Sequence, residues 1–514
     1  MKKKLLPLLS LLTICGLCFS CGVTFADHHV IIDISNSNSN GKIYTPKEVT
    51  ITETHHSLES KRFYNTQVLP SVGDVNILVI PILLPGYEKI YINSDTVDDK
   101  ALIRQDIEKV FFGESEDTGY ESVSSFYKKS SYGKLNINGK VTNWFDVKAK
   151  LGYQNAAEID VPETYDLVNA AIEWVKGTQD IDLTDYDNDK DGYIDGVWCI
   201  YSCPNYQNGG PNTDYGNYWA YTSWGNQVPS DGYEPNVNNP VYNLFGWASY
   251  DFMYGAYDDG RLDAHTYIHE MGHFLGLNDY YSDQLTYSPL GRIDMMDSNV
   301  IDHNSYSKML LGWTKPYLVT GPGKIQLYSM ENKNQFIVIP DDSYSCKNGE
   351  FDPFSEYILI ELYTNDHLNY LDSVDPLYER PAAPTESGVR IYHIDNRKFY
   401  TDFTNEYDVK IKEYAGEVID DTHKIFLPIT NYRGANEYNY ILGFDHSYNL
   451  YDEIRLIEAT NVDTFSFGGY QKAKSYFNNQ TFDLNTYGKN FFYNENVFNN
   501  GKSFSYQIKV GEVK

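Results

Sequence analysis

Cysteine is scarce in this sequence. The chain has 514 residues and only six cysteines, three of which fall within the first 26 residues. The other three are Cys199, Cys203 and Cys346. So low and odd a number excludes a fold that disulfides hold together, and the three are too few and too scattered for a zinc ribbon. A single bridge between Cys199 and Cys203 stays open as an alternative.

Positive charge and long apolar runs are also scarce. Lys and Arg together number 41 against 71 Asp and Glu, which gives a formal net charge of −30. This balance argues against nucleic acid or an anionic membrane as the main partner, because both would repel the chain. After the first 26 residues no apolar run is long enough for a transmembrane helix. We therefore expect a mature chain that is released or only surface-associated, and monomeric.

The first 26 residues are typical of a secretory signal peptide. Three lysines at residues 2–4 precede an apolar stretch, Leu5–Phe19, that is too short to span a bilayer comfortably, and Thr24 and Ala26 are small residues at the cleavage positions. The expected location is therefore extracellular. The alternative is a surface lipoprotein anchored at Cys21, which ranks second because Cys18 and Phe19 are poor residues for the positions before it.

Residues 27–73 are polar and include the low-complexity stretch "SNSNSNG" at 35–41, which predicts a flexible leader or short pro-segment. The apolar run "VNILVIPILLP" at 75–85 then predicts a buried strand. Helical spacing follows in "ALIRQDIEKVFFG" and in "ETYDLVNAAIEWVKG", which end at Gly113 and Gly177. Between them, "SVSSFYKKSSYGKLNINGKV" predicts a helix and then a strand. Residues 74–318 are therefore expected to form an α+β domain.

The pattern changes to period two from about residue 320. Apolar and polar residues alternate in "KIQLYSM", "QFIVIP", "EYILIELY", "GVRIYHID", "DEIRLIEA" and "FSYQIKV". These segments lie between loops rich in Asn, Asp and Gly. We therefore expect residues 319–514 to be a mainly antiparallel, β-sandwich-like region.

The stretch "HEMGHFLGLND", residues 269–279, carries the most specific pattern in the chain. On a helix at about 100° per residue, one side is an apolar stripe made of Ala264, Ile268, Met271 and Leu275. The opposite side carries His269, Glu270 and His273. The apolar stripe is expected to face a core and the polar side to face open space, because a fully buried helix would not tolerate three such groups.

Histidines four residues apart on a helix reach a single metal ion at ~2.0–2.1 Å, and this is the spacing of His269 and His273. Gly276 allows the backbone to leave the helix sharply, which brings Asp279 back as a third ligand. Two histidines, one carboxylate and one open position describe a catalytic zinc site. Glu270 need not bind the metal and is placed to act as general base on a zinc-activated water. His265, one turn earlier, is expected to be a neighbour and not a ligand.

A methionine-containing turn lies beneath the zinc in metzincin-type sites. In "GRIDMMDSNVIDHNSYSKMLLGW", Met296 is the expected methionine and Met295 is its close competitor. Just after this turn, Tyr306 and His303 are candidates to donate a hydrogen bond to a developing oxyanion. Of these two, we assign the catalytic role to Tyr306.

The loop "DNDKDGYID" resembles a calcium-binding loop in its spacing. It places Asp187, Asp189, Asp191 and Asp195 at positions one, three, five and nine, with Gly192 at the sharp turn. Position twelve is Trp198 where an EF-hand has Glu, and the residues that follow predict a strand in place of a helix. We therefore expect a structural Ca²⁺ in an EF-like loop.

Taken together, these segments resemble the secreted zinc metallopeptidases of the immune inhibitor A family. The likeness rests on the zinc motif, on "SVSSFYKKSSYGKLNINGKV", on "DYDNDKDGYIDGVWCIYS", on "SKMLLGW" and on "EYILIELY…GVRIYHIDNR". It covers roughly residues 75–400. The family implies a metzincin-like domain with one zinc on His269, His273 and Asp279, and with Glu270 as the catalytic base.

The sequence therefore predicts a secreted zinc endopeptidase that hydrolyses protein or peptide substrates. Two alternatives stay open. One is a zinc hydrolase that acts on a non-peptide substrate, since the metal chemistry is shared. The other is an extracellular binding or adhesion protein whose peptidase domain is inert.

Overall fold

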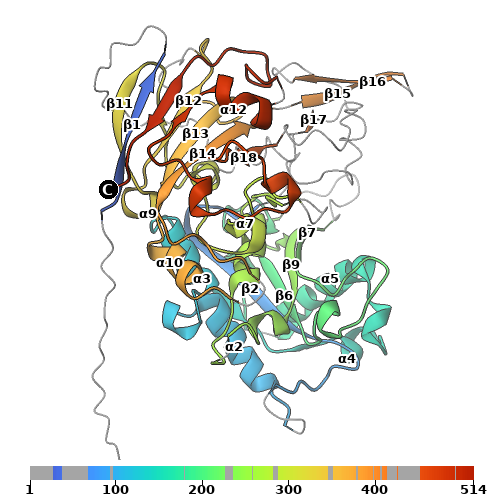
Figure 1. The fold of residues 1–514 in the computed structure, drawn as a ribbon. Coiled ribbons are helices and arrows are strands. Elements are labelled where there is room, and N and C mark those ends of the chain that lie inside the picture. Colours follow the sequence, from blue (N-terminus) through green and yellow to red (C-terminus); the bar gives the residue numbers. More distant parts are fainter. Residues whose placement is uncertain are drawn as a thin grey trace, which may run out of the picture.

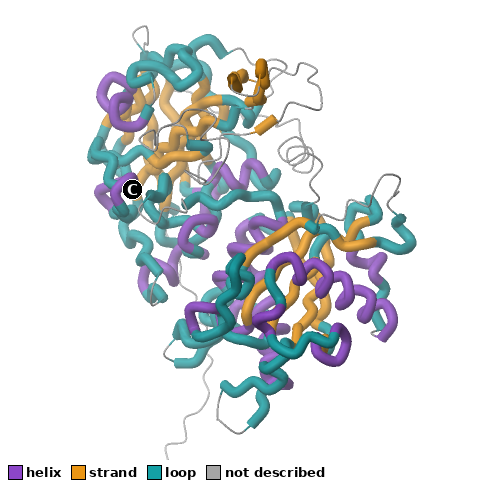
Figure 2. The backbone as a smooth tube through the Cα atoms, turned by 90° about the vertical axis from the view of Figure 1, so that its right-hand side faces the viewer, coloured by secondary structure: helices purple, strands orange, loops and turns teal. Residues whose placement is uncertain are grey.

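The computed structural model describes residues 27–36, 68–92, 97–178, 180–225, 236–257, 259–281, 287–344, 351–377, 380–397, 452–492 and 494–514, and places strands within 399–405, 408–413 and 425–426. The described chain is mixed α/β with several sheets. The first half lies below the β-rich second half in Figure 1, and the turned view of Figure 2 shows the same division.

The first half is built on a five-strand path in the order β3-β2-β6-β9-β7. The first three pairings along this path are parallel, and β7 pairs antiparallel with β9 at the edge. The strand bounds are β2 Gly73–Leu83, β3 Leu135–Val141, β6 Val197–Tyr201, β7 Tyr221–Trp224 and β9 Leu244–Ser249; the short β4, Phe145–Asp146, also pairs with β2.

Both faces of this sheet are covered, which explains the continuous apolar run of β2. Val75, Ile77 and Val79 pack on one face with α2 (Lys100–Phe112), α3 (Val123–Ser130) and α6 (His265–Phe274). Leu78, Ile80 and Ile82 pack on the other face with α4 (Val147–Leu151) and α5 (Val161–Thr178). The helices and strands predicted for this half are confirmed in type, with α5 extending one residue past Gly177.

The second half contains two larger sheets. One has the order β10-β12-β13-β14-β18 and the other has the order β11-β1-β20-β19. Their strands are β10 Tyr317–Leu318, β11 Gly323–Tyr328, β12 Phe336–Pro340, β13 Glu356–Tyr363, β14 Gly388–Asp395, β18 Ile454–Leu456, β19 Thr481–Phe482 and β20 Gln507–Val510. A smaller pairing joins β16 (Asp408–Glu413), β15 (Phe399–Asn405) and β17 (Ile425–Phe426). In the first half, β5 (Tyr193–Ile194) also pairs with β8 (Val241–Tyr242).

The β10–β18 sheet is buried on both faces. Alternate residues of β13 show this: Ile358 and Ile360 join an apolar cluster shared with the β1 sheet, whereas Tyr357 and Leu359 join the cluster shared with α6. The sheet therefore lies between the first half and the β1 sheet, as Figure 1 shows. The two halves consequently share one continuous core cluster.

Strand β1, His29–Ser35, corrects one prediction. The sequence predicts a flexible leader or short pro-segment here. The residues instead form the second strand of the β11-β1-β20-β19 sheet, hydrogen-bonded on both sides, which corrects the flexibility. A pro-segment stays a prediction. Val30, Ile32 and Ile34 are at most 1% exposed. The remainder of the predicted leader lies outside the described residues from 37 to 67, and Val68 and Leu69 are buried against the first half.

Cys199 and Cys203 are buried and unbridged, so the disulfide left open by the sequence does not form. Cys346 and the predicted signal peptide, residues 1–26, lie outside the described residues. None of the helices in the described chain has the length and apolar character needed to span a membrane.

Candidate metal centre

Helix α6 carries the central motif and is more deeply buried than the sequence predicts. Its apolar stripe faces the core as expected, since Ala264, Ile268, Met271 and Leu275 are all 0% exposed. The opposite side is only partly accessible, because His269 is 4% and Glu270 7% exposed while His273 is half-buried. The burial is tolerated because each polar group on this side has a hydrogen-bond partner.

Both histidine rings are oriented by backbone carbonyls. His269 Nδ1 lies 2.8 Å from the carbonyl oxygen of Met295, and His273 Nδ1 lies 2.8 Å from that of Leu277. A carbonyl only accepts, so each Nδ1 carries a proton. Each Nε2 is then the ring nitrogen through which a metal would bind, after losing any proton it carries.

The two Nε2 atoms converge on one carboxylate oxygen. Asp279 Oδ1 lies 3.0 Å from His269 Nε2 and 3.2 Å from His273 Nε2. Ligand atoms held tetrahedrally around one zinc at ~2.0–2.1 Å lie about 3.3 Å apart. The three side chains therefore have the atom types and the spacing that a zinc ion requires.

The local charges agree with this close approach. Burial alone would lower the pKa of His273, but the Asp279 carboxylate outweighs it and raises the pKa to about 9. Burial would likewise raise the pKa of Asp279, and the two histidines instead hold it below its ordinary value. The carboxylate and the imidazoles thus stabilise each other in the described chain.

Asp279 reaches this position because the chain turns sharply after α6. Gly276 has a φ of +93°, a left-handed conformation that strongly favours glycine. The Leu277 N–H returns to the Gly272 carbonyl at 3.0 Å, and the Tyr280 N–H donates to the Met296 carbonyl at 2.7 Å. These bonds confirm the turn expected at Gly276 and fix the backbone on both sides of Asp279.

Glu270 lies beside the edge strand of the first-half sheet. The Thr222 hydroxyl on β7 is 3.0 Å from the Glu270 carbonyl and 3.2 Å from its Oε2. Burial raises the pKa of Glu270, and the neighbouring His273 and His269 act in the opposite direction. A carboxylate in this position, next to two imidazoles, can accept a proton and release it again.

The methionine turn is the short helix α7, Met295–Ser298. A Cβ atom added to Gly272 would lie well inside van der Waals contact with Met296 Sδ and 3.0 Å from its Cε. The Met296 side chain therefore packs directly against the helix between the two histidines. Met295 contributes its carbonyl to His269 and not its side chain.

Tyr306, on α8 (Ser305–Leu310), does not fit the predicted oxyanion role. The residue is 0% exposed, and its hydroxyl donates to Glu453 Oε1 at 2.6 Å. His303 is also buried, and neither of its ring nitrogens has a hydrogen-bond partner among the described residues. His265 lies apart from the three ligands, held between Asp263 and Asp372.

The acidic loop brings three of its four predicted residues together. Single carboxylate oxygens of Asp187, Asp189 and Asp195 lie within 4.8 Å of one another, whereas Asp191 is outside this group. Burial and the charge of Asp189 raise the pKa of Asp195 to about 8, and its buried Oδ1 has no hydrogen-bond partner among the residues that the structure describes. The loop leads into strands β5 and β6, as predicted.

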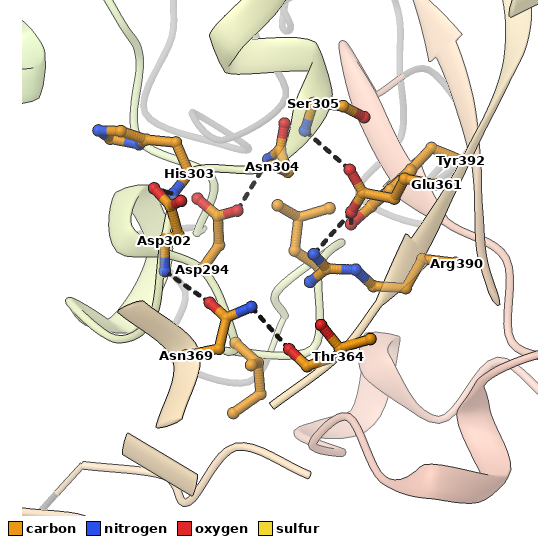
Figure 3. A network of polar contacts seen from close by, with 12 residues as sticks. Asp294, Asp302, His303, Asn304, Ser305, Glu361, Thr364, Asn369, Arg390 and Tyr392 are labelled. Atoms are coloured by element: carbon orange, nitrogen blue, oxygen red, sulfur yellow. Dashed lines mark hydrogen bonds and ion pairs between the residues drawn. The ribbon is translucent and has the colours of Figure 1, made fainter. Parts of the chain in front are cut away.

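Sequence analysis missed the polar residues that the second half contributes. Glu361 and Arg390 lie opposite each other on β13 and β14 and form an ion pair at 2.6 Å. Glu361 also accepts from the Ser305 N–H at 2.8 Å, at the beginning of α8 (Figure 3). The alternating pattern predicts the strands in which Glu361 and Arg390 lie, but the sequence gives no sign of which residues these two contact.

The same is true of Glu453, just before β18. Its Oε2 accepts a hydrogen bond from Asn278 Nδ2 at 2.9 Å, and Asn278 is the residue before Asp279. The two residues are 175 positions apart in the sequence, so no local pattern connects them.

Comparison with known proteins agrees with this geometry. The immune inhibitor A peptidase M6 catalytic domain matches residues 88–300, which include α6, Asp279 and α7. A search of curated proteins found no match. Peptidases of this kind are metallopeptidases, and over residues 88–300 the chain is similar to the catalytic domain of the immune inhibitor A family of peptidases.

Proposed function

We propose that this protein is a secreted zinc endopeptidase that hydrolyses peptide bonds of extracellular proteins. The observation that supports it best is the convergence of His269 Nε2 and His273 Nε2 on Asp279 Oδ1. These three residues would hold the zinc, with the fourth position left for water and substrate. When bound, the zinc supplies Lewis-acid chemistry, polarising a carbonyl group and making water a stronger acid.

Glu270 is the proposed general base. It lies on the same side of α6 as the two histidines, held by Thr222, with its carboxylate among the ligand side chains. It would take the proton of the attacking water and pass it to the nitrogen of the leaving amine. Tyr306 is left out of this scheme because its hydroxyl is donated to Glu453.

The substrate is proposed to bind along β7. This strand pairs with β9 on one side, ends the strand path of the first-half sheet, and contacts Glu270 through Thr222. An extended peptide adds readily to such an edge, because its backbone completes the hydrogen bonds of the outer strand. The scissile bond would then pass over Glu270 and the ligand set.

Several finer assignments are part of the same proposal. The first half, residues 74–318, would be metzincin-like, and the two larger sheets of residues 319–514 would pack as a sandwich. The apolar cluster that the β10–β18 sheet shares with the β1 sheet supports this arrangement. Secretion rests on the signal-like pattern of residues 1–26.

A structural Ca²⁺ in the acidic loop is also proposed, and the buried, unpartnered Asp195 Oδ1 supports it. Three carboxylates this close repel one another unless a cation or protons neutralise them. Added Ca²⁺ should raise the thermal unfolding midpoint of the chain. Asp195→Asn should lose most of that increase, and an equal increase in the variant would contradict the site.

The test of the peptidase is cleavage of an unfolded protein by the purified chain, with and without a zinc chelator. Glu270→Gln should retain stoichiometric zinc and lose at least about a hundredfold in rate. The control is Glu173→Gln, the same change at an exposed site on α5, which should cut like the wild type. Chelator-sensitive ester hydrolysis without peptide cleavage would favour the non-peptide hydrolase, and no hydrolysis at all by the zinc-loaded chain would favour the binding protein.

A further inference from the structure

The turn that carries Asp279 is attached to the second half of the chain by a buried carboxylate. Glu453 is 0% exposed and uses both of its oxygens: Oε2 accepts from Asn278 Nδ2 at 2.9 Å, and Oε1 accepts from the Tyr306 hydroxyl at 2.6 Å. Its own carbonyl accepts from the Asp395 N–H at 3.1 Å, which ties it to the end of β14. Glu453 thus joins a metal-ligand loop, helix α8 and the β10–β18 sheet.

The position of Asp279 depends on the residues on either side of it. On one side the Tyr280 N–H is bonded to the Met296 carbonyl of α7, within the first half. On the other side the Asn278 side chain is bonded to Glu453, in the second half. A hydrogen bond to a carboxylate is shorter and stronger than one between neutral groups, so the Asn278 contact is well suited to fix a loop.

The sheet next to Glu453 is itself closely packed. It is buried on both faces, and Glu361 on β13, two strands away from β18, accepts from the first turn of α8 while paired with Arg390 (Figure 3). Two carboxylates of one sheet therefore hold α8 and the loop of Asp279 against a common frame. A loop tied to such a frame loses little mobility when a metal binds, which favours tight binding.

We propose that Glu453 is a positioning residue of the metal centre, which acts through Asn278 to keep Asp279 in place as the third ligand. The inference rests on the proposed zinc site. It makes the second half of the chain part of the metal-binding unit and not a separate accessory region.

The test measures how fast zinc leaves the full-length chain to a chromophoric chelator. Asn278→Ala and Glu453→Ala should each speed the loss of zinc about tenfold, the lower end of the roughly 10–100-fold loss of metal affinity that follows when outer hydrogen bonds of metal ligands are removed. The double variant should be no faster than the faster single variant, because both changes remove the same contact. Glu453→Gln keeps an acceptor for Asn278 and should stay within about threefold of the wild type.

The control for loss of general stability is Tyr218→Phe. It removes a buried hydroxyl that donates to the Ala156 carbonyl at 2.6 Å, within the cluster on the opposite face of the first-half sheet from α6. This variant should release zinc at the wild-type rate. Rates of the two alanine variants within twofold of wild type, or effects that multiply in the double variant, would overturn the proposal. A wild-type chain that takes up no zinc would instead refute the proposed function.

Discussion

The contact between Gly272 and Met296 gives a prediction whose sign depends on a second residue. A Cβ at position 272 would lie 3.0 Å from Met296 Cε and closer still to Sδ, whereas ordinary contacts lie at about 3.5–4.0 Å. Met296 is 0% exposed and must therefore shift within a packed core. Such overpacking costs about 1–3 kcal/mol, which exceeds the gain of about 0.5–1 kcal/mol from replacing glycine by alanine in a helix.

Gly272→Ala should therefore lower the free energy of unfolding of the metal-free wild-type chain by roughly 1–2 kcal/mol. In a Met296→Ala background the obstructing atoms are absent, so the same change should raise it by about 0.5–1 kcal/mol. Met296→Ala alone should cost about 2–5 kcal/mol through the cavity it leaves. The sign of the Gly272→Ala effect thus reverses between the two backgrounds.

The assay is urea unfolding of the four metal-free proteins, followed by tryptophan fluorescence. Trp198 is a local reporter because its ring stacks on Phe274 of α6, with centroids 5.2 Å apart. The comparison requires equal urea dependence in all four proteins. If Gly272→Ala stabilises both backgrounds equally, Met296 is not packed against α6 in the way the structure shows.

Two further predictions concern β1 and the half-buried carboxylate of Glu331. Ile32 is 0% and Ile31 41% exposed. Ile32→Ala should therefore lower the free energy of unfolding by about 2–5 kcal/mol, whereas Ile31→Ala should change it by less than about 0.5 kcal/mol. Equal and small effects of the two changes would show that residues 29–35 are a flexible leader after all. Burial raises the pKa of Glu331 from 4.5 to about 7, although the positive charge of Lys308 acts in the opposite direction. The contribution of Glu331 to the free energy of unfolding is therefore complete below about pH 4.5 and is lost as the pH rises through about 7. Between about pH 5 and 8 the wild type should therefore lose up to roughly 3 kcal/mol relative to Glu331→Gln, and parallel urea midpoints for the two proteins would contradict this.

The three residues of the candidate metal centre could be predicted to come together because they are close in sequence. His269, His273 and Asp279 lie within eleven positions, and helical geometry together with the turn at Gly276 is enough to bring them together. The element types of both halves were predictable for the same reason, since periodicity is a local property.

Contacts between distant segments could not be predicted in this way. Glu453 meets Asn278 through the packing of a whole sheet, and the hydroxyl of Tyr306 points to Glu453 although Tyr306 follows the methionine turn closely. The buried polar side of α6 is a related case. The hydrogen-bond partners of His269 and Glu270, the Met295 carbonyl and the Thr222 hydroxyl, come from other elements.

Strand β1 was misjudged for a different reason. The low-complexity "SNSNSNG" that begins at Ser35 suggested disorder for the whole segment. Yet Val30, Ile32 and Ile34 alternate with polar or exposed positions, which is the signal of a strand with one buried face. The composition of the segment thus predicts disorder, whereas the periodicity of these seven residues predicts the strand.

The place of β1 has a consequence for any protease that cuts the chain between Ser35 and Val68. The strand is held by hydrogen bonds to β11 and β20, and its first residue, His29, pairs with Lys514. A cut therefore does not by itself detach the strand. In the uncut chain the strand behaves as a tethered ligand with an effective concentration on the order of millimolar. After a cut, the strand and the rest of the protein are separate chains. The fraction of the protein that holds β1 is then set by a bimolecular equilibrium. The activity of a nicked preparation would then depend on dilution, whereas that of the uncut protein would not.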